Sequence, residues 1–448
     1  MATDMKICII GCGLRTPLLI HGLAHSELSG IRLLLYDTAP GRAELMAALG
    51  RGIAKGTGLR LESAGTLENA VRDCSFVISS IRPGEMEARA RDERLAVECG
   101  FAGQETTGPA GFAMALRTVP VAVEHARVVE RLAPEAWIVN FTNPAGLITQ
   151  AISTHTRASA IGICDTPAEL FFRISLTLHQ PLDQVQCDYF GLNHLGWVAG
   201  VQVAGKDFIE RLLNDDDGLR SLYPAKLFEP ELIRRLRLIP TEYLYFYYNQ
   251  RTAHANQLRV GATRGEELVA LNRKVFDQIR LRVGAADIEG AVQAYRDYLN
   301  RRNASYMHLE AAGTSAFSEP EVNWDPFAAA TGYHRIAVDT IRALQASTPS
   351  RIVLNVSNRG AIEDLADNDV VEVPCVVGKS GPRPVATRQL PDECKALVLA
   401  VKRYERLTIE AAMTGDVEAA TFALFQNPIV ADWALAERYV DQLTRRSN

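Results

Sequence analysis

Short, continuous apolar runs alternate with segments of helical periodicity over the first third of the chain. Strands are expected at 6–10, 31–36, 75–79, 137–139 and 158–163, and helices at 17–25, 66–73, 110–132 and 144–155. Unbroken apolar runs are typical of parallel strands that are covered on both faces. Because strand, helix and strand follow one another at crossover spacing, the pattern predicts an α/β fold with a doubly wound, parallel, Rossmann-like sheet.

The pattern changes after about residue 170. Neighbouring strands are expected at 185–190 and 197–203, amphipathic helices at 266–283, 288–301 and 327–344, late strands at 352–356 and 370–377, and closing helices within 391–413, 416–425 and 430–445. We therefore expect a Rossmann-like domain at 1–168 and a mixed α+β domain at 169–448. The loop-like stretch 311–324 is expected to lie over a site.

Composition narrows the class of protein. The 448 residues are 47% hydrophobic, which is enough for a large core, and the net charge of −5 without a basic stripe argues against nucleic acid. No apolar run reaches the ~18 residues that span a bilayer, so we expect no membrane partner. Asp4 lies just before the first strand, unlike a signal peptide, and the eight cysteines show no paired spacing. We expect reduced thiols and a cytoplasmic protein.

The segment G-C-G-L-R-T-P at 11–17 joins the first strand to the first helix. Gly11 and Gly13 allow a tight turn that brings backbone close to a pyrophosphate, and the helix N-terminus favours negative charge. We expect Thr16 to cap this helix and Pro17 to be its first residue. Asp37 ends the second strand, where a carboxylate would hold a ribose 2′-hydroxyl and repel a 2′-phosphate, so NAD is expected rather than NADP. The third glycine is replaced by Thr16, and a turn that binds nothing is the alternative.

A thiol and an imidazole follow in the same half of the chain. Cys164 ends the strand at 158–163, and His194 lies in the turn-rich segment G-L-N-H-L-G-W at 191–197. Ligands bind beyond the carboxyl ends of such strands, and a Cys/His pair completed by substrate or water would be an open metal site. The alternative is a packed thiol and a hydrogen-bonded histidine.

Taken together, several segments resemble the NAD- and divalent-metal-dependent glycosidases of glycoside hydrolase family 4, and among them most of all the 6-phospho-β-glucosidases. The resemblance runs over nearly the whole chain. It is carried by 11–17, I-R-P-G-E-M-E-A-R-A-R-D-E-R at 81–94, G-Q-E-T-T-G-P-A-G-F at 103–112, A-L-R-T-V-P at 115–120, N-F-T-N-P-A-G at 140–146, I-G-I-C-D-T-P at 161–167 and 191–197.

The resemblance implies a role for each of a set of residues. Cys164 and His194 would bind Mn²⁺ or another divalent metal ion. Contacts to NAD are implied for Gly11, Gly13, Leu14, Arg15, Thr16, Asp37, Ser80 and Asn140, and contacts to substrate or its phosphate for Arg82, Arg89, Asn143, Asn193 and Arg264. Arginine suits phosphate because its fork donates two parallel hydrogen bonds. For each arginine the alternative is a solvated helix charge.

The base in the family is a tyrosine, and the candidates lie in P-T-E-Y-L-Y-F-Y-Y at 240–248. If this segment is one helix, Tyr243 and Tyr247 share a face. Tyr243 is the predicted base because of its spacing to Arg264, whereas Tyr245 and Tyr248 are interpreted as packing.

The residue after the metal cysteine follows the substrate in this family: Asn for 6-phospho-β-glucosides, Asp for 6-phospho-α-glucosides and His for unphosphorylated α-glycosides. Asp165 occupies that place here, so the anomeric preference stays open. Asp165 is either a general acid for the leaving group or an N-cap for the helix after Pro167.

The resemblance implies an enzyme that hydrolyses (6-phospho-)β-glucosides. NAD would oxidise C3, Tyr243 would deprotonate C2 with its own pKa lowered by the metal, the aglycone would be eliminated, water would add and the hydride would return. Three alternatives remain: a 6-phospho-α-glucosidase or a relative that takes another 6-position anion, a malate- or lactate-type dehydrogenase, and a non-catalytic NAD-binding regulator. The partners expected are a small-molecule phosphoglycoside and further copies of the chain in a homodimer or homotetramer.

Overall fold

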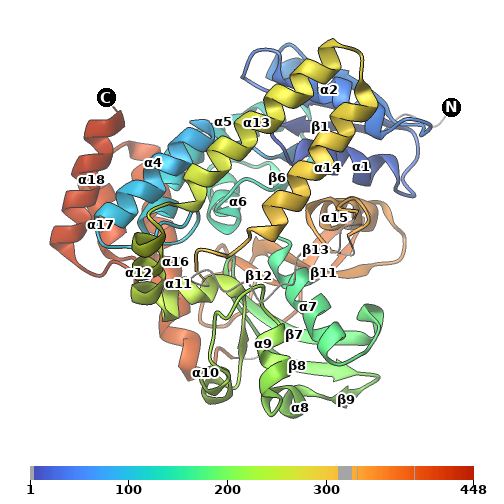
Figure 1. The fold of residues 1–448 in the computed structure, drawn as a ribbon. Coiled ribbons are helices and arrows are strands. Elements are labelled where there is room, and N and C mark those ends of the chain that lie inside the picture. The colour runs from blue at the N-terminus through green and yellow to red at the C-terminus, as the bar shows by residue number, and fades with distance from the viewer. Residues whose placement is uncertain (1–4, 311–324, 330, 388, 448) are drawn as a thin grey trace.

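A computed structural model describes residues 5–310, 325–329, 331–387 and 389–447 (Figure 1). The predicted loop at 311–324 lies outside the described residues. The strands of the main sheet are β1 (Met5–Ile10), β2 (Ile31–Tyr36), β3 (Arg60–Ser63), β4 (Phe76–Ser79), β5 (Trp137–Asn140), β6 (Ser159–Gly162), β11 (Ser350–Ser357), β12 (Val370–Gly378) and β13 (Gly381–Pro384). Within the described residues this sheet has nine strands, in the order β13-β12-β11-β6-β5-β4-β1-β2-β3.

The part of the sheet from β6 to β3 is parallel, whereas β11, β12 and β13 add to it in antiparallel register. The helices between the parallel strands, with the one after β6, are α1 (Thr16–Ala24), α2 (Arg42–Ile53), α3 (Leu67–Val71), α4 (Glu85–Glu98), α5 (Gly108–Leu132), α6 (Ala145–His155) and α7 (Thr166–Thr177). The predicted doubly wound Rossmann-like sheet is therefore confirmed. The hydrophobic pattern gave no signal for β3, an edge strand in which Leu61 alone is buried.

The expected cap of α1 is wrong. Arg15 occupies the cap position, and Thr16 is already the first helical residue, followed by Pro17. The Thr16 hydroxyl donates to the Gly11 carbonyl at 3.4 Å instead of accepting from the first turn. Thr16 therefore braces the glycine turn from inside the core.

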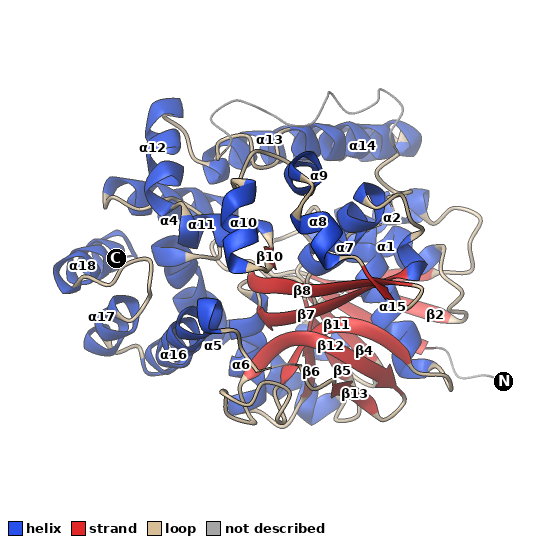
Figure 2. Cartoon of the chain, turned by 90° about the horizontal axis from the view of Figure 1, so that it is seen from below, coloured by secondary structure: helices blue, strands red, loops and turns tan. Residues whose placement is uncertain are grey.

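A smaller sheet lies against the first and is followed by helices (Figure 2). Its strands are β7 (Val185–Leu192), β8 (Leu195–Val203), β9 (Lys206–Asp207) and β10 (Ile239–Pro240), and the short 3₁₀ helices beside it are η1 (Leu182–Gln184) and η2 (Glu242–Leu244). The remaining helices are α8 (Ile209–Leu213), α9 (Asp216–Ser221), α10 (Pro230–Leu236), α11 (Tyr245–Tyr248), α12 (Gln250–Val260), α13 (Arg264–Gly284), α14 (Ile288–Ala304), α15 (Tyr333–Gln345), α16 (Asp392–Thr414), α17 (Val417–Phe425) and α18 (Trp433–Ser447).

This region confirms the expected α+β character. The expected helix at 327–344 begins only at Tyr333, after Gly332, whose φ of 120° ends the preceding turn. Among the residues that the structure describes, no helix combines the length and apolar character needed to cross a membrane.

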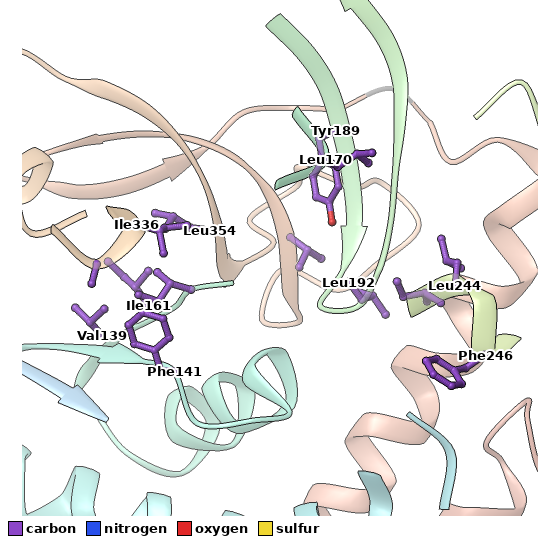
Figure 3. Close-up of a cluster of buried hydrophobic side chains, with 14 of the residues drawn as sticks. Val139, Phe141, Ile161, Leu170, Tyr189, Leu192, Leu244, Phe246, Ile336 and Leu354 are labelled. Atoms are coloured by element: carbon purple, nitrogen blue, oxygen red, sulfur yellow. The ribbon is translucent and has the colours of Figure 1, made fainter. Parts of the chain in front are cut away.

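One buried hydrophobic cluster joins the two sheets. Figure 3 shows it running from Val139 and Ile161 on the main sheet to Tyr189 on β7 and Leu244 in η2. The Tyr189 hydroxyl also donates to Glu372 of β12 at 2.6 Å. Because the two sheets share one core, the end of β6 and the β7–β8 turn are held in a fixed relation, and that relation forms the site.

Candidate functional site

The turn between β1 and α1 opens onto a cavity of about 630 Å³. Gly11 has a φ of +90°, and a side chain there would collide with the Ser80 carbonyl, so only glycine fits this close approach. A Cβ on Gly13, by contrast, would meet no atom within 4 Å, which leaves open space beside the backbone. The turn therefore provides the cradle that a pyrophosphate at a helix N-terminus requires.

Asp37 fixes the far side of this turn. One carboxylate oxygen accepts the Cys12 N–H at 2.6 Å and the other accepts the Ala39 N–H at 2.7 Å. The side chain lies at the cavity with lone pairs that can still accept hydrogen bonds. This arrangement suits a ribose hydroxyl and would repel a 2′-phosphate.

The other predicted cofactor residues divide into two groups. Leu14, Arg15 and Ser80 line the cavity. Asn140 does not, because its side-chain amide donates to the Ala145 carbonyl at 3.2 Å and its side-chain oxygen accepts the Thr142 N–H at 3.0 Å. Asn140, like Thr16, is fully buried and holds a turn next to the cavity.

Two predicted substrate arginines share a carboxylate that the sequence reasoning missed. Arg82 lies 2.6 Å and Arg89 lies 2.9 Å from Glu105, and Arg89 also pairs with Glu93 at 2.7 Å. Burial alone would raise the pKa of Glu105, but the arginines outweigh it and hold the pKa well below its usual range. The alternative of a solvated helix charge is therefore wrong for Arg89, which is buried. Both arginines line the cavity, as does the predicted substrate residue Asn143.

Arg264 is the first residue of α13, and its guanidinium forms hydrogen bonds that link α13 to the end of α14. It donates to Ser305 Oγ at 2.7 Å, to the Arg302 carbonyl at 2.9 Å and to Glu267 at 3.1 Å. It does not line the cavity, whereas the neighbouring Arg302 does. Within the part of the chain that the structure describes, Arg302 has no ion-pair partner and is the cation that sequence reasoning missed.

The predicted metal ligands come from two different sheets. Cys164 follows β6, and His194 lies in the tight β7–β8 turn with a φ of 61°. His194 Nδ1 lies 2.7 Å from Thr106 Oγ1, and the ring stacks on Tyr243 with centroids 3.7 Å apart and planes at 9°. Burial lowers the pKa of His194 to about 3, so the imidazole is neutral, as a metal ligand must be.

The donor set fits an open metal site. Thiolate and imidazole nitrogen both ligate first-row divalent metals. The Asn193 amide donates to Glu372 at 3.1 Å, while its side-chain oxygen is buried without a partner in the described structure. No group of three His, Cys, Asp or Glu side chains suited to a metal occurs among the described residues. A metal held by Cys164 and His194 would therefore keep positions for substrate or water.

The segment at 240–248 is not the single helix that the shared face of Tyr243 and Tyr247 assumed. Tyr243 lies in the 3₁₀ helix η2, and Tyr247 lies in the short helix α11 that follows it directly. Tyr243 stacks on His194, whereas burial first, and then the neighbouring Tyr404 and Glu405, raises the pKa of Tyr247.

Tyr243 is half-buried. Burial raises the pKa of its hydroxyl well above the usual value. The Tyr306 hydroxyl lies 3.4 Å from that of Tyr243 and donates to Glu242 at 3.2 Å. Tyr245 and Tyr248 bond the Glu310 carbonyl and Trp197, in keeping with their interpretation as packing residues.

Asp165 occupies the cap position of α7, but its carboxylate accepts no hydrogen bond from the helix. The capping role is therefore wrong. Burial raises the pKa of Asp165, and the nearby charge of Arg15 opposes that shift. Arg15 also donates to the Tyr333 hydroxyl at 2.9 Å and lies 3.9 Å from the centre of its ring. Tyr333 is a further site residue without a sequence signal, because it starts a helix far along the chain.

Comparison with known proteins gives matches over most of the chain. The model of the family 4 glycosyl hydrolases matches residues 6–176, and that of their C-terminal domain matches residues 189–430. A probable 6-phospho-β-glucosidase of Bacillus subtilis (strain 168) is 29% identical over 99% of this chain and 96% of its own. A maltose-6′-phosphate glucosidase of the same organism is 26% identical over 94% and 90%.

Comparison with solved structures gives the same family. The 6-phospho-β-glucosidase of Thermotoga maritima with NAD and glucose-6-phosphate superposes with a TM-score of 0.83 at 28% identity, covering 99% of this chain and 98% of that one. A second structure of that enzyme, with manganese, NAD⁺ and glucose-6-phosphate, gives a TM-score of 0.81 at 27% identity and the same coverage.

Proposed function

The chain belongs to the family 4 glycosyl hydrolases. On that premise we propose that it hydrolyses 6-phosphoglucosides and prefers the β-linked ones. The reaction would need bound NAD and a divalent metal ion, for which Mn²⁺ is the first candidate. One observation carries the proposal. The nucleotide cavity is lined by Gly11, Gly13 and Asp37 together with the paired arginines Arg82 and Arg89, and the same chain stacks Tyr243 on the buried His194.

The chemistry divides between bound groups and side chains. When bound, NAD would supply a hydride acceptor for C3 of the sugar and the metal a Lewis acid beside the oxidised carbon. Tyr243, whose ring stacks on the proposed ligand His194, would take the proton from C2 as the phenolate, the form that a bound divalent metal ion favours. Asp165, half-buried and unused as a cap, gives a proton to the leaving oxygen. After the aglycone has left, water adds at C1 and the hydride returns to C3, so the cofactor ends each turnover in its oxidised form.

The cations around the cavity supply the 6-phosphate subsite. Arg82 and Arg89 already share Glu105, so their forks are oriented before substrate binds. Arg302 adds a charge that has no carboxylate partner in the described structure, and Arg264 holds it in place through the Arg302 carbonyl. Asn143 contacts the sugar from the same cavity, and Asn193 offers its unpartnered oxygen next to His194.

A 6-phospho-α-glucosidase is the second candidate. The Cys164–Asp165 pair favours it, as does the similarity to the maltose-6′-phosphate glucosidase. A 2-hydroxy-acid dehydrogenase is the weaker alternative, because that chemistry needs a His–Asp pair, and His194 instead has Thr106 on Nδ1. A regulator without activity would leave the Cys164, His194 and Tyr243 arrangement without a purpose.

A panel of p-nitrophenyl α- and β-glucosides, with and without 6-phosphate, tests the proposal. We expect turnover of the 6-phospho-β-glucoside with NAD, Mn²⁺ and a thiol, and little when NADP replaces NAD, because Asp37 repels the extra phosphate. Faster turnover of the α-anomer would select the second candidate. Turnover without NAD or metal, or none of any 6-phosphoglucoside, would contradict the proposal.

A further inference from the structure

We propose that Gln104 and Thr106 are positioning residues that fix the tautomer of His194, so that its proton lies on Nδ1 and Nε2 stays free for a metal ion. The inference rests on the proposed function, because it takes His194 to be a metal ligand. It concerns how the protein prepares that ligand before any metal arrives.

Gln104 determines which group donates in each hydrogen bond between it, Thr106 and His194. Its Oε1 lies 2.6 Å from the Thr106 backbone nitrogen and 2.8 Å from the Thr107 backbone nitrogen. Both of these N–H groups can only donate, so the Gln104 atom that faces them must be the carbonyl oxygen. Oε1 is therefore a fixed acceptor, tied to the turn just before α5.

The next link is the Thr106 hydroxyl, which lies 2.9 Å from Gln104 Oε1 and 2.7 Å from His194 Nδ1. A hydroxyl has one proton to donate. When that proton points to the fixed acceptor on Gln104, the oxygen presents a lone pair to His194, and Nδ1 must be the donor.

A neutral imidazole carries a single ring proton. With that proton on Nδ1, the lone pair of Nε2 is available to a metal; with the hydroxyl turned the other way, Nε2 would be protonated and unable to bind one. Partners on the second ring nitrogen commonly tune metal-binding histidines in this way. The stacked Tyr243 ring, 3.7 Å away, keeps the imidazole in the plane that this hydrogen bond requires.

Thr107, the neighbour of Thr106, provides a matched control for the loss of a hydroxyl group. The Thr107 hydroxyl lies 3.2 Å from the same Gln104 oxygen, and among the described residues the hydrogen-bond partner of His194 Nδ1 is Thr106. Removing the Thr107 hydroxyl disturbs the same turn but keeps the hydrogen bond between Thr106 and the His194 imidazole. Thr106→Val and Thr107→Val therefore remove the same hydroxyl group from neighbouring residues. Only Thr106→Val should change the tautomer of His194.

The experiment measures Mn²⁺ binding to the metal-free protein by electron paramagnetic resonance of the free ion, with NAD binding as a check on the fold. Thr106→Val should weaken Mn²⁺ affinity by roughly 10- to 100-fold, the usual cost of losing such a partner. Thr106→Ser, which keeps the hydroxyl, and Thr107→Val should stay close to the wild-type affinity. NAD affinity should be unchanged in all three variants.

The tautomer itself is read from ¹⁵N shifts of labelled histidine in the metal-free wild-type protein, assigned with His194→Ala. The proposal predicts a proton on Nδ1 of His194, and a shift toward Nε2–H in Thr106→Val. A wild-type signal from Nε2–H would overturn the proposal even if Thr106→Val failed to fold. So would wild-type Mn²⁺ affinity in a folded Thr106→Val protein. If His194→Ala and Cys164→Ser both bind Mn²⁺ like the wild type, the proposed metal site is wrong instead.

Discussion

The two halves of the site are built in different ways. The nucleotide half runs from Gly11 to Asp37 in one stretch of chain, and backbone groups form most of it, including the N–H groups that hold Asp37. The proposed metal half takes Cys164 from the end of β6, His194 from the β7–β8 turn and Tyr243 from η2, and the His194–Tyr243 stack depends on how these segments pack. The comparison teaches that a backbone cradle is encoded locally, whereas a side-chain centre depends on packing across the whole molecule.

Substitutions in one half should therefore affect its own function and spare that of the other half. The largest loss of turnover is expected in the metal half. Cys164→Ser should reduce turnover to the background rate, because the proposed thiolate ligand is lost, while NAD affinity stays near the wild-type value, since Cys164 does not line the nucleotide cavity. Isothermal titration with NAD and an assay of the 6-phosphoglucoside check this. Cys187→Ser, a buried thiol on β7, is the control and should stay active. Full activity in metal-stripped Cys164→Ser would remove Cys164 from the centre.

The tyrosine pair gives the next largest effect. Tyr243→Phe should lower turnover by a factor on the order of 10² or more, the scale of a positioned general base, without loss of stability. Tyr247→Phe deletes the same hydroxyl from the neighbouring helix and should change turnover little. Steady-state kinetics and thermal melts on both variants decide the assignment, and a loss confined to Tyr247→Phe would reverse it.

Two glycines sharpen the description of the nucleotide half. Gly13→Val should fold normally but weaken NAD binding about tenfold or more, because its side chain would fill space that now lies open beside the turn. Gly11→Ala should instead lower stability by about 1–3 kcal/mol, since its φ is +90° and the methyl group meets the Ser80 carbonyl. Equal melting temperatures and equal NAD affinities in the two variants would contradict this division.

The smallest effect concerns stability against pH where α1 packs on α15. Burial lowers the pKa of His21 and of His334 to about 4. His25 and His334 lower the pKa of His21 further, Arg335 lowers both pKa values, and Asp325 opposes the shift of His21. Both imidazoles are neutral in the fold and protonate near pH 6.5 when unfolded, so their contribution is present above pH 6.5 and is lost as the pH falls toward 4. His334→Leu should flatten the fall in urea-unfolding free energy between pH 7 and 5, and an unchanged fall in that variant would contradict the assignment.

Much of the fold could be predicted from the sequence, because the unbroken apolar runs of β1, β2 and β4 leave one way to cover both faces. The nucleotide turn was found by its motif, and the pairing of Cys164 with His194 stays a prediction. The winding of η2, which puts Tyr243 and Tyr247 in different helices, left no motif in the sequence.

Other site residues were missed because a tertiary contact gives each of them its role. Glu105 matters through Arg82 and Arg89, and Tyr333 through Arg15, and neither pairing leaves a local signal. The domain boundary at residue 168 and the expected oligomer stay predictions.

The central claim, cleavage by oxidation and elimination, is tested most directly by the fate of hydrogen at C2. Wild-type protein should release deuterium from a C2-labelled 6-phosphoglucoside into solvent during turnover, deuterium at C3 should slow the reaction, and both effects should require NAD. Mass spectrometry of the glucose-6-phosphate formed gives the answer. Cleavage that keeps the C2 label in full and proceeds without NAD would contradict the account.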